Sequence, residues 1–239
     1  MSPIIIFDLY DTILKDISFN FNNGLEYLYN SFLSHKCTLS ELKNYALTFK
    51  PLYDERRLTN NELCFIRDEA PLLFKKFDIC PNADEAILDY NIMNHIQKEI
   101  LLDEVRETLD ILYSKGVHMY VLSNSIFLAS SNQHLLDEFG IGKYFRKVYS
   151  SADFGKRKPD LSFFNYALDD ICKLEHNINI NDIFYVGNDY KTDVNGSQNA
   201  GLKTIWYNVQ GLPNTDNLNI YDINNFRDII NIIFTCKLF

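Results

Sequence analysis

Short apolar runs along the chain have the pattern of buried β-strands. Continuous runs of β-branched and aromatic residues are typical of strands covered on both faces of a parallel sheet. Four runs are clear and one is weaker, at residues 3–7, 117–122, 183–186, 203–207 and, more weakly, 147–150. Segments between them have helical spacing, at 101–113, 162–174 and 194–200. This alternation predicts an α/β fold with a doubly wound, Rossmann-like parallel sheet.

The stretch from about residue 18 to residue 97 differs, because helical spacing runs through it without an intervening strand. Helices are predicted at 21–33, 40–53, 59–77 and 83–95, and a last one near the C-terminus at 226–234. Thr59 and Glu62 have the spacing of a capping box. The insertion predicts a second, smaller helical domain at 17–96, with the core formed by 1–16 and 97–239.

Composition narrows the class of protein. The chain has 239 residues, is 46% hydrophobic and carries a net charge of −9, which fits a globular protein and disfavours a nucleic-acid partner. No apolar run approaches the roughly 20 residues of a membrane span, and no signal peptide is readable. Widely spaced cysteines without a Cys-x-x-Cys pair predict reduced thiols in a cytoplasmic protein. They are Cys37, Cys64, Cys80, Cys172 and Cys236.

Polar side chains follow the predicted strands, where loops of an open α/β sheet converge on a ligand. They include carboxylates and amides, which suit a divalent cation, and hydroxyls and a lysine, which suit an anion. These residues are Asp8, Tyr10, Asp11 and Thr12 after the first strand, Ser123 and Asn124 after the second, Lys158 after the weak strand, and Asn188, Asp189 and Asp193 after the 183–186 run.

The four groups, in this order, resemble the motifs of the haloacid dehalogenase (HAD) superfamily. The similar segments are Phe7-Asp8-Leu9-Tyr10-Asp11-Thr12, Val121-Leu122-Ser123-Asn124, Lys158-Pro159-Asp160 and 185–194 with its following glycines. The resemblance covers about 1–16 and 97–210. The helical insertion matches the C1 cap domain of that family in position and length.

The resemblance implies a hydrolase with a covalent aspartyl intermediate. Asp8 would be the nucleophile, and water would hydrolyse the intermediate. Ser123 would bind the oxygens of the transferring group, helped by Asn124 and by backbone N–H groups near Thr12. Lys158 would neutralise charge on the nucleophile and on the transferring group.

The resemblance also implies a Mg²⁺ cofactor, which screens the repulsion between two anions. Its ligands would be Asp8, the backbone carbonyl of Tyr10, and either Asn188 or Asp189. Asp193 would orient the lysine or a metal-bound water. The implied partner is a small phosphorylated molecule rather than a nucleic acid or a membrane.

Two positions depart from the family pattern. Family phosphatases usually have an aspartate as general acid/base two residues after the nucleophile, and Tyr10 stands there, with Asp11 one place late where glycine is usual. A tyrosine has an ordinary pKa near 10 and transfers protons poorly at neutral pH. Asn188 stands where a metal-binding aspartate is usual, so weaker metal affinity is expected.

Three readings of the function follow. The favoured one is a Mg²⁺-dependent phosphatase acting on a small phosphate monoester. The alternative enzyme is a metal-independent 2-haloacid dehalogenase, a branch with tyrosine at the Tyr10 position. That branch also has a tyrosine where Phe164 stands, and it would need Arg56 or Arg57 to bind the substrate carboxylate. The third reading is a catalytically relict binding module. Oligomeric state cannot be read from the sequence.

Overall fold

The centre of the fold is a six-stranded sheet in which every neighbouring pair of strands is parallel. The computed structural model describes residues 2–175 and 178–235. The strand order is β5-β4-β1-β6-β7-β8. Their bounds are β1 (Ile4–Phe7), β4 (His118–Ser123), β5 (Phe145–Ser150), β6 (Ile183–Gly187), β7 (Lys203–Tyr207) and β8 (Tyr221–Ile223). The α/β fold with a Rossmann-like parallel sheet is confirmed.

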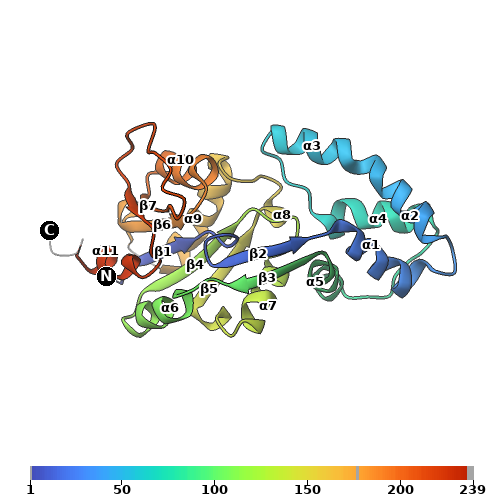
Figure 1. Ribbon diagram of the computed structural model, residues 1–239, viewed down its shortest axis with the longest axis horizontal. Coiled ribbons are helices and arrows are strands. Elements are labelled where there is room, and N and C mark those ends of the chain that lie inside the picture. The colour runs from blue at the N-terminus through green and yellow to red at the C-terminus, as the bar shows by residue number, and fades with distance from the viewer. Residues whose placement is uncertain (1, 176–177, 236–239) are drawn as a thin grey trace.

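Helices cover both faces of this sheet, and alternate residues of its central strand enter separate cores (Figure 1). Ile5 and Phe7 pack in the larger core, while Ile4 and Ile6 pack in a smaller one. All four are buried, which explains the continuous apolar run. The helices are α6 (Val105–Ser114), α7 (Ala129–Glu138), α8 (Ser151–Phe154), α9 (Leu161–Glu175), α10 (Asn195–Asn199) and α11 (Asp228–Thr235).

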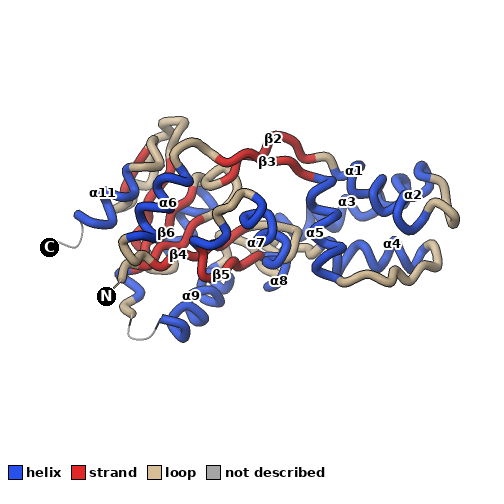
Figure 2. Tube along the Cα trace, turned by 90° about the horizontal axis from the view of Figure 1, so that it is seen from below, coloured by secondary structure: helices blue, strands red, loops and turns tan. Residues whose placement is uncertain are grey.

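The helical insertion is joined to the sheet by an antiparallel ribbon that the sequence pattern did not predict. Its strands are β2 (Leu14–Phe19) and β3 (Gln97–Leu101), and Figure 2 shows it between the sheet and the inserted helices. We call those helices the cap helices; they are α1 (Phe21–Leu28), α2 (Leu39–Ala46), α3 (Lys50–Leu58), α4 (Ala70–Lys76) and α5 (Glu85–Ile96). Shorter helical turns extend them at Tyr29–Leu33, Leu47–Phe49 and Phe65–Glu69.

Two predicted helix starts are wrong. No helix begins at Thr59: Asn60 has a left-handed backbone with φ 53°, and Asn61 forms a bridge with Lys156 instead. The helix expected from residue 101 begins at Val105, because residue 101 ends β3 and Glu104 turns the chain with φ 64°. A capping box does occur, at Thr38 and Glu41, where it starts α2.

The cap helices dock onto the core through buried polar contacts. Asp89 of α5 accepts hydrogen bonds from the backbone N–H of Leu128, at 2.8 Å, and from the hydroxyl of Ser131, at 2.6 Å. The carboxylate therefore acts as an N-terminal cap for α7, although it comes from a distant segment.

Two further features concern the state of the cysteines and the lengths of the helices. The cysteines at 37, 64, 80 and 172 are free, and Cys236 lies outside the described residues. Within the described ranges, no helix has both the length and the apolarity that crossing a membrane requires.

Candidate active site

Side chains from three strand ends meet in a buried cluster beside β1. Asp8 follows β1, and its backbone N–H donates to the carbonyl of Val186 in the neighbouring β6, at 2.8 Å. Lys158 Nζ lies 2.5 Å from Asp8 Oδ1 and 2.7 Å from Asp193 Oδ1. The order of strands reverses at β1, the position at which open α/β sheets bind ligands.

The ammonium group in this cluster lies between two carboxylates and away from water. Lys158 is 1% exposed. Burial acts to lower its pKa, but Asp193 and Asp8 raise the pKa more, so the side chain carries a positive charge. Burial raises the pKa of Asp8 to about 7, although Lys158 counteracts this effect. The cluster therefore places one cation against a carboxyl group that is otherwise costly to ionise.

Tyr185 is a member of this cluster that sequence reasoning missed. Its hydroxyl donates to Asp193 Oδ1 and accepts from Lys158 Nζ, both at 2.8 Å. The residue lies inside β6, where its only signal was a phenol in an apolar strand. Burial raises its pKa well above the ordinary value, so the hydroxyl stays protonated and holds both partners.

Asp193 reaches the cluster because the strand before it ends in glycine. A Cβ atom at Gly187 would lie 2.5 Å from Asp193 Cγ, closer than any side chain permits. The second carboxylate oxygen accepts from the backbone N–H of Asp189, at 3.0 Å. Asp193 is therefore fixed by contacts on both oxygens.

Of the two candidate metal ligands after β6, only Asn188 faces Asp8. Thr12 Oγ1 lies 3.0 Å from Asp8 Oδ2 and 3.3 Å from Asn188 Oδ1, and its single proton is shared between them. Asp189 is exposed, and its carboxylate instead accepts from the backbone N–H of Thr192, at 2.6 Å. Asp189 is thus the N-cap of the following helical turn.

Ser123 and Asn124 have different surroundings, although they are adjacent. Ser123 is fully buried, and its hydroxyl has no hydrogen-bond partner among the described residues. Such a group is uncommon in a folded protein. At the end of a strand, this hydroxyl is free to donate to a ligand. Asn124 is occupied: its amide donates to the carbonyl of Lys158 and its oxygen accepts from the N–H of Lys158. These two bonds shape the lysine loop, and the binding of the transferring group by Asn124 stays a prediction.

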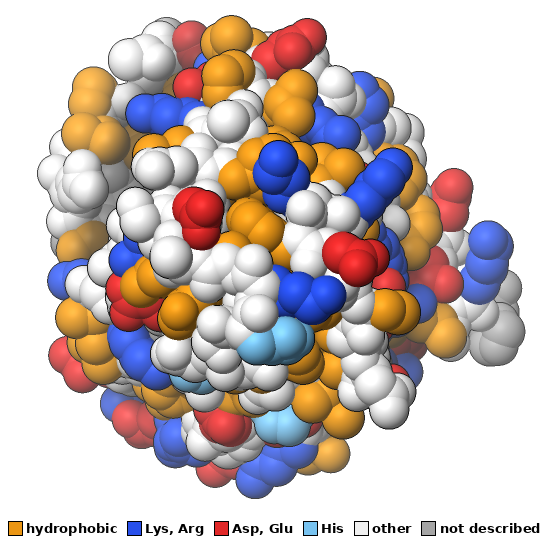
Figure 3. Space-filling view, turned by 90° about the vertical axis from the view of Figure 1, so that its right-hand side faces the viewer, with side chains coloured by type: hydrophobic (Ala, Val, Ile, Leu, Met, Phe, Trp, Pro, Cys, Tyr) orange, Lys and Arg blue, Asp and Glu red, His pale blue; other side chains and the backbone are white. Residues whose placement is uncertain are grey.

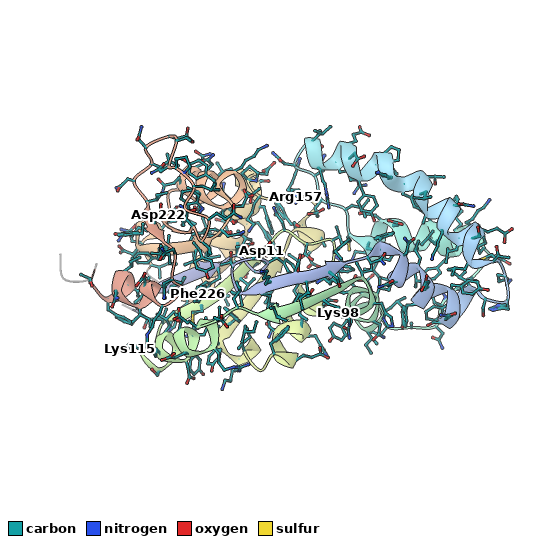
Figure 4. All side chains as sticks on the ribbon, in the orientation of Figure 1. Asp11, Lys98, Lys115, Arg157, Asp222 and Phe226 are labelled. Carbon is teal, nitrogen blue, oxygen red and sulfur yellow. The ribbon has the colours of Figure 1, made fainter. Side chains whose placement is uncertain are left out.

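The two residues expected near the general-acid position both point elsewhere. The hydroxyl of Tyr10 accepts from Gln97 of β3 and donates to Asn132 of α7, both at 2.8 Å. Burial raises its pKa, so it is a poorer proton donor than a free tyrosine. Asp11 is exposed and has a left-handed backbone with φ 58°, which explains why glycine is usual there. It lies in the turn between β1 and β2, three residues before β2 begins (Figure 4).

A small cavity of about 170 Å³ opens between these strand ends and the cap helices. Arg157, in the gap between the sheet and α3 (Figure 4), lies 3.5 Å from the buried carboxylate of Glu62. Arg57 of α3 also lines the cavity, whereas Arg56 is paired with Asp68 at 3.1 Å. The full lining is Tyr10, Asp16, Phe19, Arg57, Glu62, Gln97, Asn124, Ser125, Ile126, Phe127 and Arg157.

The oxygen atoms beside Asp8 fit a hard cation. In the part of the chain that the structure describes, no three His, Cys, Asp or Glu side chains gather to hold a metal by themselves. The carboxylate of Asp8 and the amide oxygen of Asn188 do converge, since both lie within hydrogen-bond distance of Thr12 Oγ1. Mg²⁺ binds through few protein oxygens and keeps several waters, so this donor set suits it.

Comparison with known proteins identifies the family. Residues 5–207 match the model of the haloacid dehalogenase-like hydrolases. The chain belongs to this family. It is therefore a hydrolase, as the ordered motifs predict.

The named relatives have low sequence identity to this chain. The HAD-hydrolase YfnB of Bacillus subtilis is 24% identical over 185 residues, which cover 76% of this chain and 73% of YfnB. The pyrimidine 5'-nucleotidase PynA of Streptococcus pneumoniae is 26% identical over 133 residues, 55% of this chain and 54% of that protein. The chain thus spans about half the length of the nucleotidase.

Solved structures share the fold over nearly the whole chain. The 2-haloacid dehalogenase of Pseudomonas syringae pv. Tomato DC3000 has a TM-score of 0.66 and 20% identity, covering 99% of this chain and all of that one. The magnesium-bound structure of YfnB has a TM-score of 0.58 and 21% identity, covering 97% of this chain and 98% of that one. At these identities the likeness concerns the fold alone.

Proposed function

We propose that this hydrolase is a phosphatase that cleaves small phosphate monoesters, with Asp8 as its nucleophile. The observation that carries the proposal is the buried Lys158, held between Asp8 and Asp193, together with the buried hydroxyl of Ser123, which has no hydrogen-bond partner in the part of the chain that the structure describes. A fixed cation and a free donor suit the oxygens of a phosphoryl group. We also propose that residues 17–96 form the cap domain over this site.

The chain's own residues account for the covalent steps. A carboxylate oxygen of Asp8 attacks phosphorus, a P–O bond to Asp8 forms, and the ester P–O bond breaks as the alkoxide leaves and takes a proton from water. Lys158 offsets the negative charge that gathers during this attack, and Ser123 donates to a phosphoryl oxygen. Water then attacks the phosphorus of the aspartyl phosphate, which releases inorganic phosphate and restores Asp8.

The oxygen atoms of Asp8 and Asn188, which lie close together beside Thr12, fit a magnesium ion. Asp8, Asn188 and the backbone carbonyl of Tyr10 would hold it. When bound, the ion supplies positive charge that lets one anion attack another. An amide in place of a carboxylate removes one negative charge from the donor set, so we expect weak affinity.

The leaving alcohol needs a proton, and family phosphatases usually supply it from an aspartate two residues after the nucleophile. Tyr10 is committed to Gln97 and Asn132, and Asp11 is exposed. The leaving alcohol therefore receives little help from a positioned acid, and the proposal favours esters of acidic alcohols such as phenols.

The tyrosine at position 10 also supports the dehalogenase alternative. In that case Asp8 would attack carbon and displace halide, and the carboxylate of the substrate would pair with Arg57. Asn188 in place of an aspartate is compatible with that metal-independent reaction. The ground for preferring the phosphatase is that oxygen atoms of Asp8 and Asn188 converge near Thr12, an arrangement that suits a cation.

Parallel assays distinguish the phosphatase from the dehalogenase and from the relict binding module. Hydrolysis of p-nitrophenyl phosphate and of 2-chloropropionate is measured with Mg²⁺ and with EDTA. We expect turnover of the phosphate ester only, lost in EDTA, and lowered by at least about 1,000-fold in Asp8→Asn. Asp78→Asn, at an exposed turn, is the matched control and keeps full activity. Turnover of the haloacid alone in EDTA contradicts the proposal; no turnover and no beryllium fluoride binding indicates a relict module.

A further inference from the structure

A second cavity continues from the small one into the cap helices. Its volume is about 310 Å³, and it shares Phe19, Arg57 and Ile126 with the cavity at the strand ends. The small cavity is lined by Tyr10, two residues after Asp8, and by Asn124, the residue after Ser123, so the two cavities lie on the cap side of the strand ends that carry the site. We call this second cavity the cap groove; its lining is Phe19, Phe21, Asn22, Leu25, Lys43, Ala46, Leu47, Lys50, Tyr53, Arg57 and Ile126.

The walls of the cap groove are largely apolar and open to water. Phe19 is 54% exposed and Leu47 is 67% exposed, although both are large apolar side chains. Covering such surface yields about 25 cal/mol for each square ångström removed from water. Figure 3 shows the end of the molecule that the cap helices form, where hydrophobic side chains lie among Lys and Arg side chains. An apolar ring or chain would gain by entering the groove.

Two cations of α3 line the groove without partners. Lys50 and Arg57 are seven residues apart, so they lie on the same face of the helix. Neither side chain forms an ion pair or a hydrogen bond with another described residue. Arg56 and Lys43 differ, because Arg56 is bound to Asp68 and Lys43 to Glu26.

The acidic groups nearby do not cancel this positive charge. Glu62, which lines the small cavity, is paired with Arg157 and also accepts from Ser151. Asp16 remains as the only other carboxylate lining either cavity among the described residues, and it lies on the ribbon strand β2. No carboxylate lines the cap groove itself among the described residues, so Lys50 and Arg57 leave the groove net positive.

We propose that the cap groove binds the leaving alcohol, and that the preferred substrates are phosphate monoesters of an apolar, ring-sized alcohol with a second negative charge. This inference rests on the proposed phosphatase. The apolar body lies against Phe19 and Leu47, and Arg57 with Lys50 binds the second anion, such as a carboxylate. Arginine suits a carboxylate because its planar fork donates to both oxygens.

The test uses two esters of nearly equal shape, 4-carboxyphenyl phosphate and 4-carbamoylphenyl phosphate. They differ in charge at the far end of the ring, so their kcat/KM ratio isolates recognition of the anion. We expect the wild type to prefer the carboxylate ester by about tenfold. In Arg57→Gln this preference should fall to about twofold or less, through a higher KM for the carboxylate ester. Lys75→Gln, an exposed cap residue outside the groove, is the charge control and keeps the preference.

A separate variant tests the apolar wall of the cap groove. Leu47→Ser exposes no core, because the side chain is already 67% exposed. We expect it to raise KM about fivefold for both aryl esters and not for phosphoglycolate, which has no ring.

The failures of the two proposals are distinguishable. If no phosphate ester is hydrolysed, the phosphatase proposal itself is wrong. If the esters are hydrolysed but the carboxylate preference is absent, or survives in Arg57→Gln, the anion site is wrong. If Leu47→Ser affects phosphoglycolate as much as the aryl esters, the groove does not bind the leaving group.

Discussion

Asn124 and Lys158 are joined by two hydrogen bonds between the side-chain amide of the first and the backbone of the second. The amide nitrogen donates to the carbonyl at 3.1 Å, and the amide oxygen accepts from the N–H at 2.7 Å. The two residues come from loops after different strands, so this contact sets where the lysine loop lies relative to Ser123. The backbone of Lys158 is thus positioned by the side chain of an asparagine.

Asn124→Ala should therefore damage catalysis through the position of the lysine. The change leaves the N–H of Lys158 without its partner, which costs about 1–3 kcal/mol of the free energy of unfolding. We expect kcat to fall about 10- to 100-fold with little change in KM. Steady-state kinetics with p-nitrophenyl phosphate measure this, and a purely raised KM would contradict it.

Tyr185→Phe tests the phenol that links Lys158 with Asp193. The ring is retained, so packing stays close to that of the wild type while one hydroxyl is removed. We expect the free energy of unfolding to fall by about 1 kcal/mol and kcat to fall about tenfold. Urea unfolding and kinetics are measured on the same preparation. An unchanged kcat would mean that Asp193 alone holds the lysine.

Asp11→Gly tests whether the carboxylate one place late acts as a displaced acid. The residue is exposed with φ 58°, a conformation that glycine adopts freely. We expect kcat within about twofold of the wild type, whereas loss of a general acid would lower it by about 100-fold or more. Asp11→Ala is the matched control, which keeps a Cβ at positive φ and should lose about 1 kcal/mol of stability.

Asp89 makes the stability of the protein depend on pH. Burial raises its pKa from 3.8 to about 6, so the folded protein holds this proton more tightly than the unfolded chain does. Its contribution is fully present below about pH 4 and is lost as the pH rises through 6. In Asp89→Asn this dependence should disappear. Relative to the variant, the wild type should lose up to about 3 kcal/mol between pH 4 and 7. Urea unfolding at several pH values measures it, and parallel curves would contradict it.

Strands β1, β4, β6 and β7 could be predicted because they are largely buried and therefore mostly apolar. Strand β8 was not predicted, because it has three residues and only Ile223 is buried. The ribbon could not be predicted either, because β2 reads Leu-Lys-Asp-Ile-Ser-Phe and is exposed at most positions. Its pairing with β3 depends on a partner about eighty residues away, which no local pattern contains. Thr59 was misread for a related reason: the capping-box letters were present, but pairing of Asn61 with Lys156 prevailed over the local signal.

The site was predictable where a residue follows a strand, because the carboxyl ends of parallel strands meet at one edge. Asp8, Lys158 and Asp193 come together in this way. Tyr185 was not predicted as a site residue, because it lies within a strand and not after it. The choice between Asn188 and Asp189 also needed the structure, since only the backbone geometry of the turn decides which side chain caps it.

The ribbon of β2 and β3 affects which insertions the fold can accept during evolution. Phe19 and Gln97 are paired in register, so the inserted helices start and finish at adjacent points. A foreign insert grafted between those two positions would therefore leave the spacing of the parallel strands untouched. In this architecture the sheet that carries Asp8 and the helices inserted between Phe19 and Gln97 can therefore vary independently.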